Sequence, residues 1–212
     1  PCRFVGASPE LLVRRTGLHV TTNPLAGSTP RSGDLAVDRQ RAEVLLSSEK
    51  NRREHAVVVE AVAESLRPYC RKLDVPAVPS IIKTDTMIHL SSLIRGTLKD
   101  PDMNALSLAL SLHPTPAICG SPVTCAHKAI CDIEPFERRY FSGMVGWVDA
   151  QGDGEWAVSI RCAETEGCNL RLYAGAGIVA GSTAEQELAE TSAKFRTMLR
   201  AMGLEHLREV VS

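Results

Sequence analysis

The chain has 212 residues, of which 44% are hydrophobic and 23% are charged, and its formal net charge is -1 at pH 7. This length allows a substantial core and fits one domain or slightly more. The balanced charge excludes the basic excess typical of nucleic-acid-binding proteins, and no apolar run approaches the roughly 20 residues needed to span a bilayer. Because the N-terminus also lacks a signal-peptide pattern, we expect a cytoplasmic protein with no membrane or nucleic-acid partner.

The seven cysteines are scattered along the chain and include no C-x-x-C pair. Their odd number and their spacing favour reduced thiols over a zinc site or a disulfide framework. The chain also begins at Pro1, directly before an apolar stretch with the pattern of a strand. We therefore expect that a segment upstream of Pro1 is missing.

The first half of the chain combines predicted strands with one helical region. Segments rich in β-branched or alternating residues at 3–8, 10–16 and 18–27 are separated by turn residues, which indicates strands with tight connections. From 34 to 67, apolar residues recur at spacings of three and four, which predicts one long helix or two abutting helices. Proline-bounded strands are expected within 75–98.

The second half is predicted to begin with a helix over 101–114 that starts at Pro101 and Asp102. A loop and a second helix, at 123–133, come next, and three strands are expected after them, at 141–150, 154–163 and 168–175. A last long helix follows a glycine-rich loop. Because this order lacks regular βαβ alternation, it favours an α+β fold with mixed, mostly antiparallel sheets and helices packed outside.

The glycine-rich loop lies within residues 172–195, LYAGAGIVAGSTAEQELAETSAKF. Its G-x-G-x-x-x-G spacing is one residue longer than the dinucleotide-binding fingerprint, and it lacks the lysine of a P-loop. What remains is a backbone concavity at a helix N-terminus, which favours a carboxylate or a phosphate. The alternative is a simple turn with Ser182 or Thr183 as the helix N-cap.

The helix after this loop carries Glu187, Glu190 and Lys194 on one face. Two like charges three residues apart cost free energy unless a cation relieves them, and Mg²⁺ prefers such oxygen ligands. The alternative is a solvated Glu190–Lys194 pair at the favourable i, i+4 spacing.

Two more charges occupy unusual positions. Glu54 lies at the end of the apolar stripe of the long helical region. Arg161 falls within the predicted strand 154–163, on the face of the small residues Ala157 and Ser159, which suits a cleft that admits a carboxylate. An edge-strand arginine paired to a nearby acid is the alternative.

Several stretches occur in order over nearly the whole chain: FVGASPELLV, PLAGS, SEKNRREH, HLSSLIRGTL, HPTPAICGSP, GMVGWVDAQGDGEWAVSIRCA and YAGAGIVAGSTAEQELAETSAK. Together they closely resemble the chorismate-utilising enzymes, isochorismate synthases in particular. The resemblance implies the fold of anthranilate synthase component I, with residues 1–212 as the C-terminal part of a single catalytic domain. It also implies chorismate as the substrate, Mg²⁺ as the cofactor and a monomer when full-length.

The resemblance assigns roles to residues of this sequence. Glu54 and Glu190 would hold the metal, with Glu187 beside them. Substrate carboxylates would be held by Arg161, Lys194 and the backbone of Gly175 and Gly177, and the pocket would be lined by Gly27, Ser28 and Ala117.

The reaction of the family adds water at C2 of chorismate while the C4 hydroxyl leaves, which requires a base and an acid. Glu10 matches the general acid, and His89 matches a pocket histidine, although a satisfied core histidine is the default from sequence alone. The base of the family is a lysine upstream of the acid, but the first lysine here is Lys50. We therefore expect the 212-residue chain to be inactive alone. We also expect it to be poorly stable, because its sheet would expose an unpaired edge where the upstream strands belong.

Relatives that form salicylate or aminate chorismate tend to have Thr at the position of Ala117 and Lys at that of Val123. These departures favour isochorismate as the product, with a salicylate synthase or a non-catalytic chorismate-family fragment as the alternatives. The motifs favour a role in siderophore (2,3-dihydroxybenzoate) biosynthesis over a role in menaquinone biosynthesis.

Overall fold

Twelve strands and five helices follow one another within residues 2–204, which are the residues that this computed structural model describes. The strands are β1 (Arg3–Gly6), β2 (Leu11–Thr16), β3 (His19–Asn23), β4 (Leu25–Pro30), β5 (Cys70–Asp74), β6 (Ser80–Lys83), β7 (Met87–Ser91), β8 (Ile94–Leu98), β9 (Met144–Val148), β10 (Gly154–Val158), β11 (Cys162–Glu166) and β12 (Asn169–Tyr173). The helices are α1 (Leu35–Ser47), α2 (Glu49–Leu66), α3 (Ala105–Leu112), α4 (Val123–Ile133) and α5 (Ala184–Ala201).

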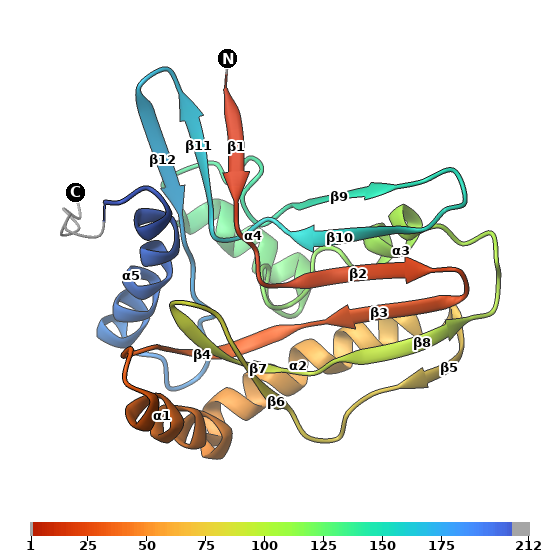
Figure 1. Cartoon of the computed structure of the whole chain (residues 1–212), viewed down its shortest axis with the longest axis horizontal. Coiled ribbons are helices and arrows are strands. Elements are labelled where there is room, and N and C mark those ends of the chain that lie inside the picture. The colour runs from red at the N-terminus through yellow and green to blue at the C-terminus, as the bar shows by residue number, and fades with distance from the viewer. Residues whose placement is uncertain (1, 205–212) are drawn as a thin grey trace.

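The strands form three sheets. A six-stranded sheet has the order β5-β8-β3-β2-β10-β9, and two three-stranded sheets have the orders β1-β11-β12 and β4-β7-β6. Every strand pair in the described residues is antiparallel. In Figure 1, β11 and β12 stand upright beside α5, above the six-stranded sheet that crosses the molecule. The predicted α+β fold with antiparallel sheets and outer helices is confirmed.

Residue Ser48 decides between one long helix and two abutting helices. Its backbone is extended (φ -66, ψ 113), and it is both the C-cap of α1 and the N-cap of α2, where its hydroxyl accepts from the Asn51 N–H. The extended residue ends one helix and its side chain starts the next. Two abutting helices is therefore the correct alternative.

The largest core lies between the six-stranded sheet and the helices α2 and α3. Leu66, Ile94 and Leu108 are fully buried in it, and each such side chain contributes about 2 kcal/mol by leaving water. A second cluster packs α1 against β7 through Leu45 and Leu90. These cores fix α2 and the β4–β7 sheet, the elements that carry several predicted site residues.

Four details of the predicted elements are wrong. The strand expected over 18–27 is β3 and β4, which lie in different sheets. The helix expected from Pro101 begins at Ala105, because the Asn104 side chain supplies the N-cap by accepting from the Ser107 N–H. Strand β5 was not expected, since its exposed charges hide a strand pattern. The strand expected over 154–163 is two strands in different sheets, because the chain bends between Val158 and Cys162.

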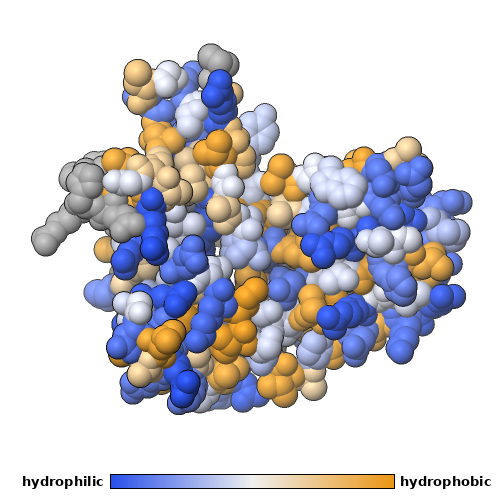
Figure 2. Space-filling model, in the orientation of Figure 1, coloured by the Kyte–Doolittle hydropathy of each residue, from blue (hydrophilic) through white to orange (hydrophobic). Residues whose placement is uncertain are grey.

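The outer surface mixes hydrophobic and hydrophilic residues. Figure 2 shows small hydrophobic groups scattered among hydrophilic ones on the face seen in Figure 1. Strand β9 ends the six-stranded sheet and exposes Val145 and Trp147. Within residues 2–204, no helix has the length and apolar character that crossing a lipid bilayer requires.

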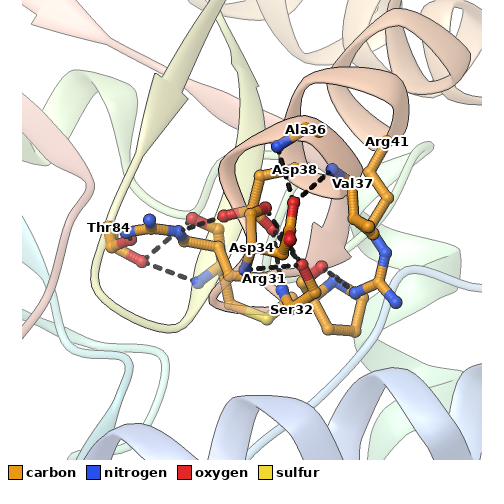
Figure 3. A network of polar contacts seen from close by, with 10 residues as sticks. Arg31, Ser32, Asp34, Ala36, Val37, Asp38, Arg41 and Thr84 are labelled. Carbon is orange, nitrogen blue, oxygen red and sulfur yellow. Dashed lines mark hydrogen bonds and ion pairs between the residues drawn. The ribbon is translucent and has the colours of Figure 1, made fainter.

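A polar network anchors the start of α1 to the neighbouring sheet (Figure 3). The buried Asp38 carboxylate accepts from Arg31 Nε at 2.8 Å and from the backbone N–H of Ser32 at 2.7 Å. Arg31 also donates to the Thr84 carbonyl, in the turn between β6 and β7. These hydrogen bonds, that of the Ser32 backbone first, lower the pKa of Asp38 to about 2.

We expect Asp38→Asn to lower the melting temperature at pH 7, because the amide loses the charge that faces Arg31. The depressed pKa means that Asp38 stabilises the fold above the ordinary carboxyl pKa and that this contribution is lost as pH falls towards 2. Thermal unfolding of both proteins should therefore show a difference that shrinks at low pH. Asp34→Asn is the control, since Asn caps helices as well as Asp; an equal effect of both variants would contradict the assignment.

Candidate functional site

Residues on or next to all three sheets line one cavity of about 100 Å³, together with residues of α2 and α5. The cavity shares six lining residues with an adjoining cleft of about 710 Å³. The structure brings to this cavity every predicted site residue except Glu187, namely Glu10, Gly27, Ser28, Glu54, His89, Ala117, Arg161, Gly175, Gly177, Glu190 and Lys194.

Glu10 is held directly before β2, after a Ser-Pro turn. Its backbone N–H donates to the Ser8 hydroxyl, and its side chain is only 4% exposed. Burial raises the pKa of Glu10 to about 7, against the opposing effects of the Leu25 backbone N–H and the charges of Arg161 and Lys194. A large fraction of Glu10 is therefore protonated at neutral pH and able to donate a proton.

Arg161 lies in the bend between β10 and β11, not within a strand as predicted. Its φ of 51° is left-handed, a conformation that residues other than glycine rarely adopt and that is found often at functional sites. Its carbonyl accepts from the Ala7 N–H at 3.0 Å, which ties the bend to β1. The side chain is 7% exposed and lines the cavity.

His89 projects from β7, whose residues are all buried, towards Arg161. The Nη2 atom of Arg161 lies 3.4 Å from His89 Nε2. Burial, followed by the charges of Arg161 and Lys194, lowers the pKa of His89 to about 3. The imidazole is therefore neutral and accepts from Arg161, whose own pKa is lowered by burial to about 10 and which stays cationic at neutral pH.

Helix α5 lines the cavity with Glu190 and Lys194. Lys194 Nζ lies 2.6 Å from Glu190 Oε1 and donates to the Gly175 carbonyl at 2.7 Å. The Ser28 hydroxyl donates to the same Glu190 oxygen at 2.9 Å. The Glu190–Lys194 pair thus forms at its i, i+4 spacing, but inside the cavity rather than on a solvated face.

Glu54 reaches the cavity from α2. Its pKa is raised by burial and then by the charge of Glu190, so the two carboxylates repel each other. Within residues 2–204, the Glu54 carboxylate takes part in no hydrogen bond or ion pair. A Cβ atom on Gly177 would stand 2.7 Å from Glu54 Oε1, so the glycine allows the loop to approach this carboxylate.

Glu187 differs from the other two glutamates in that it does not line the cavity, although its charge helps to raise the pKa of Glu54. It pairs with Lys50 Nζ at 3.0 Å. Burial raises its pKa, but hydrogen bonds from Ser182 and Lys50 outweigh that effect and lower it. In the part of the chain that the structure describes, no three His, Cys, Asp or Glu side chains form a metal-holding group.

The glycine loop contributes differently from the expected anion site. Thr183 is the N-cap of α5, as one alternative proposed, and its hydroxyl accepts from the Gln186 N–H. Gly175 and Gly177 line the cavity, whereas the residues of the first turn of α5 do not. The loop therefore reaches the cavity through Gly175 and Gly177 and not through the N-terminus of α5.

Sequence reasoning missed Arg138 and Phe141, which also line the cavity. Phe141 is 6% exposed, and its ring stacks on Tyr173 with centroids 5.2 Å apart. Arg138 forms an ion pair with Glu134. The i, i+4 spacing of these two charges was the signal available in the sequence, but it falls just beyond the predicted helix 123–133.

The chain is similar to a known family, to known proteins and to solved structures. The profile of the family described as "Chorismate binding enzyme" matches residues 2–203. Isochorismate synthase DhbC of Bacillus subtilis (strain 168) is 64% identical over 204 residues, which cover 96% of this chain and 51% of that protein. The chain thus spans about half the length of this relative.

Two solved structures share the fold. A structure from Bacillus anthracis that carries the name 2,3-dihydroxybenzoate-specific isochorismate synthase, DhbC, has a TM-score of 0.94 and 60% identity, covering 96% of this chain and 54% of that one. MenF, the menaquinone-specific isochorismate synthase of Escherichia coli, has a TM-score of 0.82 and 35% identity, covering 96% and 45%.

Proposed function

The chain belongs to the family of chorismate-binding enzymes, and on this premise we propose that it forms the C-terminal part of an isochorismate synthase. The proposed reaction is the isomerisation of chorismate to isochorismate, in which water adds at C2 and the C4 hydroxyl leaves. Mg²⁺ is the proposed cofactor. The observation that carries the proposal is the buried Glu10 carboxyl, whose pKa of about 7 suits a general acid, in a cavity that is also lined by the cationic side chains of Arg138, Arg161 and Lys194.

In this proposal each residue has a distinct task. Glu10 protonates the departing C4 oxygen. Arg161 and Lys194 bind the substrate carboxylates, with the neutral His89 orienting Arg161 through its Nε2 atom. The cavity of about 100 Å³ is smaller than most ligand pockets, so the ring would extend into the adjoining cleft lined by Ala117.

The residues present fit a magnesium ion. The Glu54 carboxylate has no hydrogen-bonding partner within the described residues, and its repulsion from Glu190 would be relieved by a cation. Both carboxylates are hard oxygen ligands of the kind Mg²⁺ prefers, and the ion keeps further positions for waters and substrate oxygens. When bound, it would neutralise and orient the substrate carboxylate. We propose Glu54 and Glu190 as its ligands, with Glu187 acting through its pair with Lys50.

Gly177→Ala should weaken Mg²⁺ binding, because the new Cβ would meet Glu54 Oε1 at 2.7 Å and displace the carboxylate. We expect a loss of about tenfold or more in Mg²⁺ affinity, measured by calorimetry in the full-length protein, as for other changes that misplace a ligand. The matched control is Gly175→Ala, whose Cβ would make an ordinary 3.6 Å contact with Phe141. Equal Mg²⁺ affinities of the two variants would refute the placement.

The base is the group that this chain does not supply. No lysine precedes Glu10, and the first one, Lys50, pairs with Glu187. We therefore propose that the 212-residue chain alone is inactive and that activity needs the part of the domain that the relatives possess in addition. Isochorismate formation by the purified chain would overturn this.

Chromatography of the products from full-length protein, chorismate and Mg²⁺ tests the proposal. Isochorismate is the expected product, whereas salicylate without accumulated isochorismate would identify a salicylate synthase. No turnover and no chorismate binding would favour a non-catalytic fragment of the family. Since 64% identity links the chain to DhbC, whose counterpart from Bacillus anthracis is named for 2,3-dihydroxybenzoate, we place the product in siderophore rather than menaquinone biosynthesis.

A further inference from the structure

Arg138 and Ile118 line three neighbouring cavities at once. They border the proposed substrate cavity, the adjoining cleft of about 710 Å³, and a third cavity of about 820 Å³ beside α4. The wall that separates these spaces therefore passes through Ile118 and Arg138. Whatever fixes this wall also fixes the shape of the substrate cavity.

The guanidinium of Arg138 is engaged on three sides. Its Nε and Nη2 atoms donate to the two oxygens of Glu134, at 2.8 and 2.5 Å, in a bidentate pair. Its Nη1 atom donates to the Ile118 carbonyl at 2.7 Å and reaches the Ser142 hydroxyl at 3.4 Å. It also lies over the ring of Phe141, 5.7 Å from the centroid.

These partners come from three separate segments, of which α4 is the loosely packed one. Ile118 lies in the turn between α3 and α4, and none of the residues of α4 is buried. Glu134 follows α4 directly, and Ser142 has a left-handed backbone, with φ 64°. One planar side chain thus connects a loosely packed helix, the turn that carries Ala117 and the approach to β9.

We propose that Arg138 is a positioning residue that holds the Ala117–Ile118 wall and the Phe141 ring in place around the substrate. It acts through these neighbours and not by contact with the reacting atoms. The inference rests on the proposed function for its kinetic consequence, but its structural consequence stands apart from it. Lysine cannot replace Arg138, because one ammonium group lacks the planar fork that meets Glu134 and Ile118 together.

In the full-length protein, Arg138→Lys should lower kcat/KM for chorismate about 10- to 100-fold, since misplacement by about 1 Å costs on this scale. The Mg²⁺ activation constant should stay within about twofold, because Arg138 contacts neither Glu54 nor Glu190. Arg139→Lys is the matched control: Arg139 pairs with Glu164 and does not line the substrate cavity. Glu134→Gln should give a smaller loss, and adding it to Arg138→Lys should cause little further loss, because the two residues act as one unit.

Equal kcat/KM values for Arg138→Lys and Arg139→Lys would overturn the proposal, as would a loss of melting temperature with unchanged kinetics below that temperature. A crystal structure of Arg138→Lys provides the readout that does not depend on the reaction. Displacement of Ile118 and Phe141 supports the proposal even if the wild-type protein makes no isochorismate, which would refute only the proposed function. Unchanged positions of both residues would refute the positioning role.

Discussion

Glu10→Gln should reduce kcat/KM of the full-length protein about 10²- to 10⁴-fold, the range that general acid catalysis contributes. The amide has the shape of the protonated acid and can still accept from the Leu25 N–H, but its N–H protons are too weakly acidic to be transferred. In the wild-type protein, kcat/KM should decline above pH about 7 as Glu10 ionises. A variant that retained more than a tenth of wild-type activity would exclude Glu10 as the acid.

The same substitution should change how stability depends on pH. The pKa of Glu10 is raised to about 7 in the fold, so its neutral form is favoured there and stability is lost as pH rises from about 4.5 to 7. A shift of this size corresponds to about 3 kcal/mol. Because Gln stays neutral, Glu10→Gln should match the wild-type protein near pH 4 and exceed its unfolding free energy at pH 8 by up to that amount.

Chemical denaturation at both pH values measures this difference. Glu155→Gln is a suitable control, because Glu155 forms an exposed pair with Arg14. If Glu10→Gln and the wild-type protein respond to pH alike, the Glu10 carboxyl is ionised in the fold across this range and does not act as a protonated acid near neutral pH.

Local sequence patterns predicted helices and strands well where a single regular pattern, such as an apolar period, covers the whole element. The helix expected at 123–133 is α4 with the same bounds, because Pro122 precedes a regular apolar period. The single strand predicted over 154–163 from the alternation of Trp156, Val158 and Ile160 is wrong, because this alternation continues through a bend at which the chain passes from one sheet to another. Arg161 adopts a left-handed backbone conformation in that bend. Because such a conformation is usually marked by glycine and none is present there, the sequence does not predict the bend.

The candidate site was found by resemblance rather than by local pattern. Glu10, Arg161 and Glu190 are separated by more than a hundred residues between the first and the last, and only the tertiary fold brings them to one cavity. Helical spacing did place Glu187 near Glu190 along α5. It could not show that Lys50, from another helix, pairs with Glu187, or that Glu187 does not line the cavity.

Glu54→Gln should remove the Mg²⁺ dependence of turnover and reduce kcat/KM by about 100-fold or more, because a metal contributes several kcal/mol of charge stabilisation. In this variant, a loss of metal binding can be distinguished from a loss of stability. The Glu54 carboxylate has no hydrogen-bonding partner in the described residues, and its charge is repelled by Glu190, so the neutral amide should leave stability unchanged or slightly higher.

Three further variants separate a ligand from a nearby charge. Glu190→Gln should lose as much activity as Glu54→Gln, but it should also lower stability, because it weakens the contacts of Glu190 with Lys194 and Ser28. Glu187→Gln should lower kcat/KM less than about fivefold, since the Lys50–Glu187 ion pair is partly exposed and contributes little. Glu60→Gln, on the exposed face of α2, should have no effect. Calorimetric titration with Mg²⁺ would refute the assignment if Glu54→Gln bound the ion as tightly as Glu60→Gln, because a carboxylate that holds magnesium cannot be neutralised without loss of affinity.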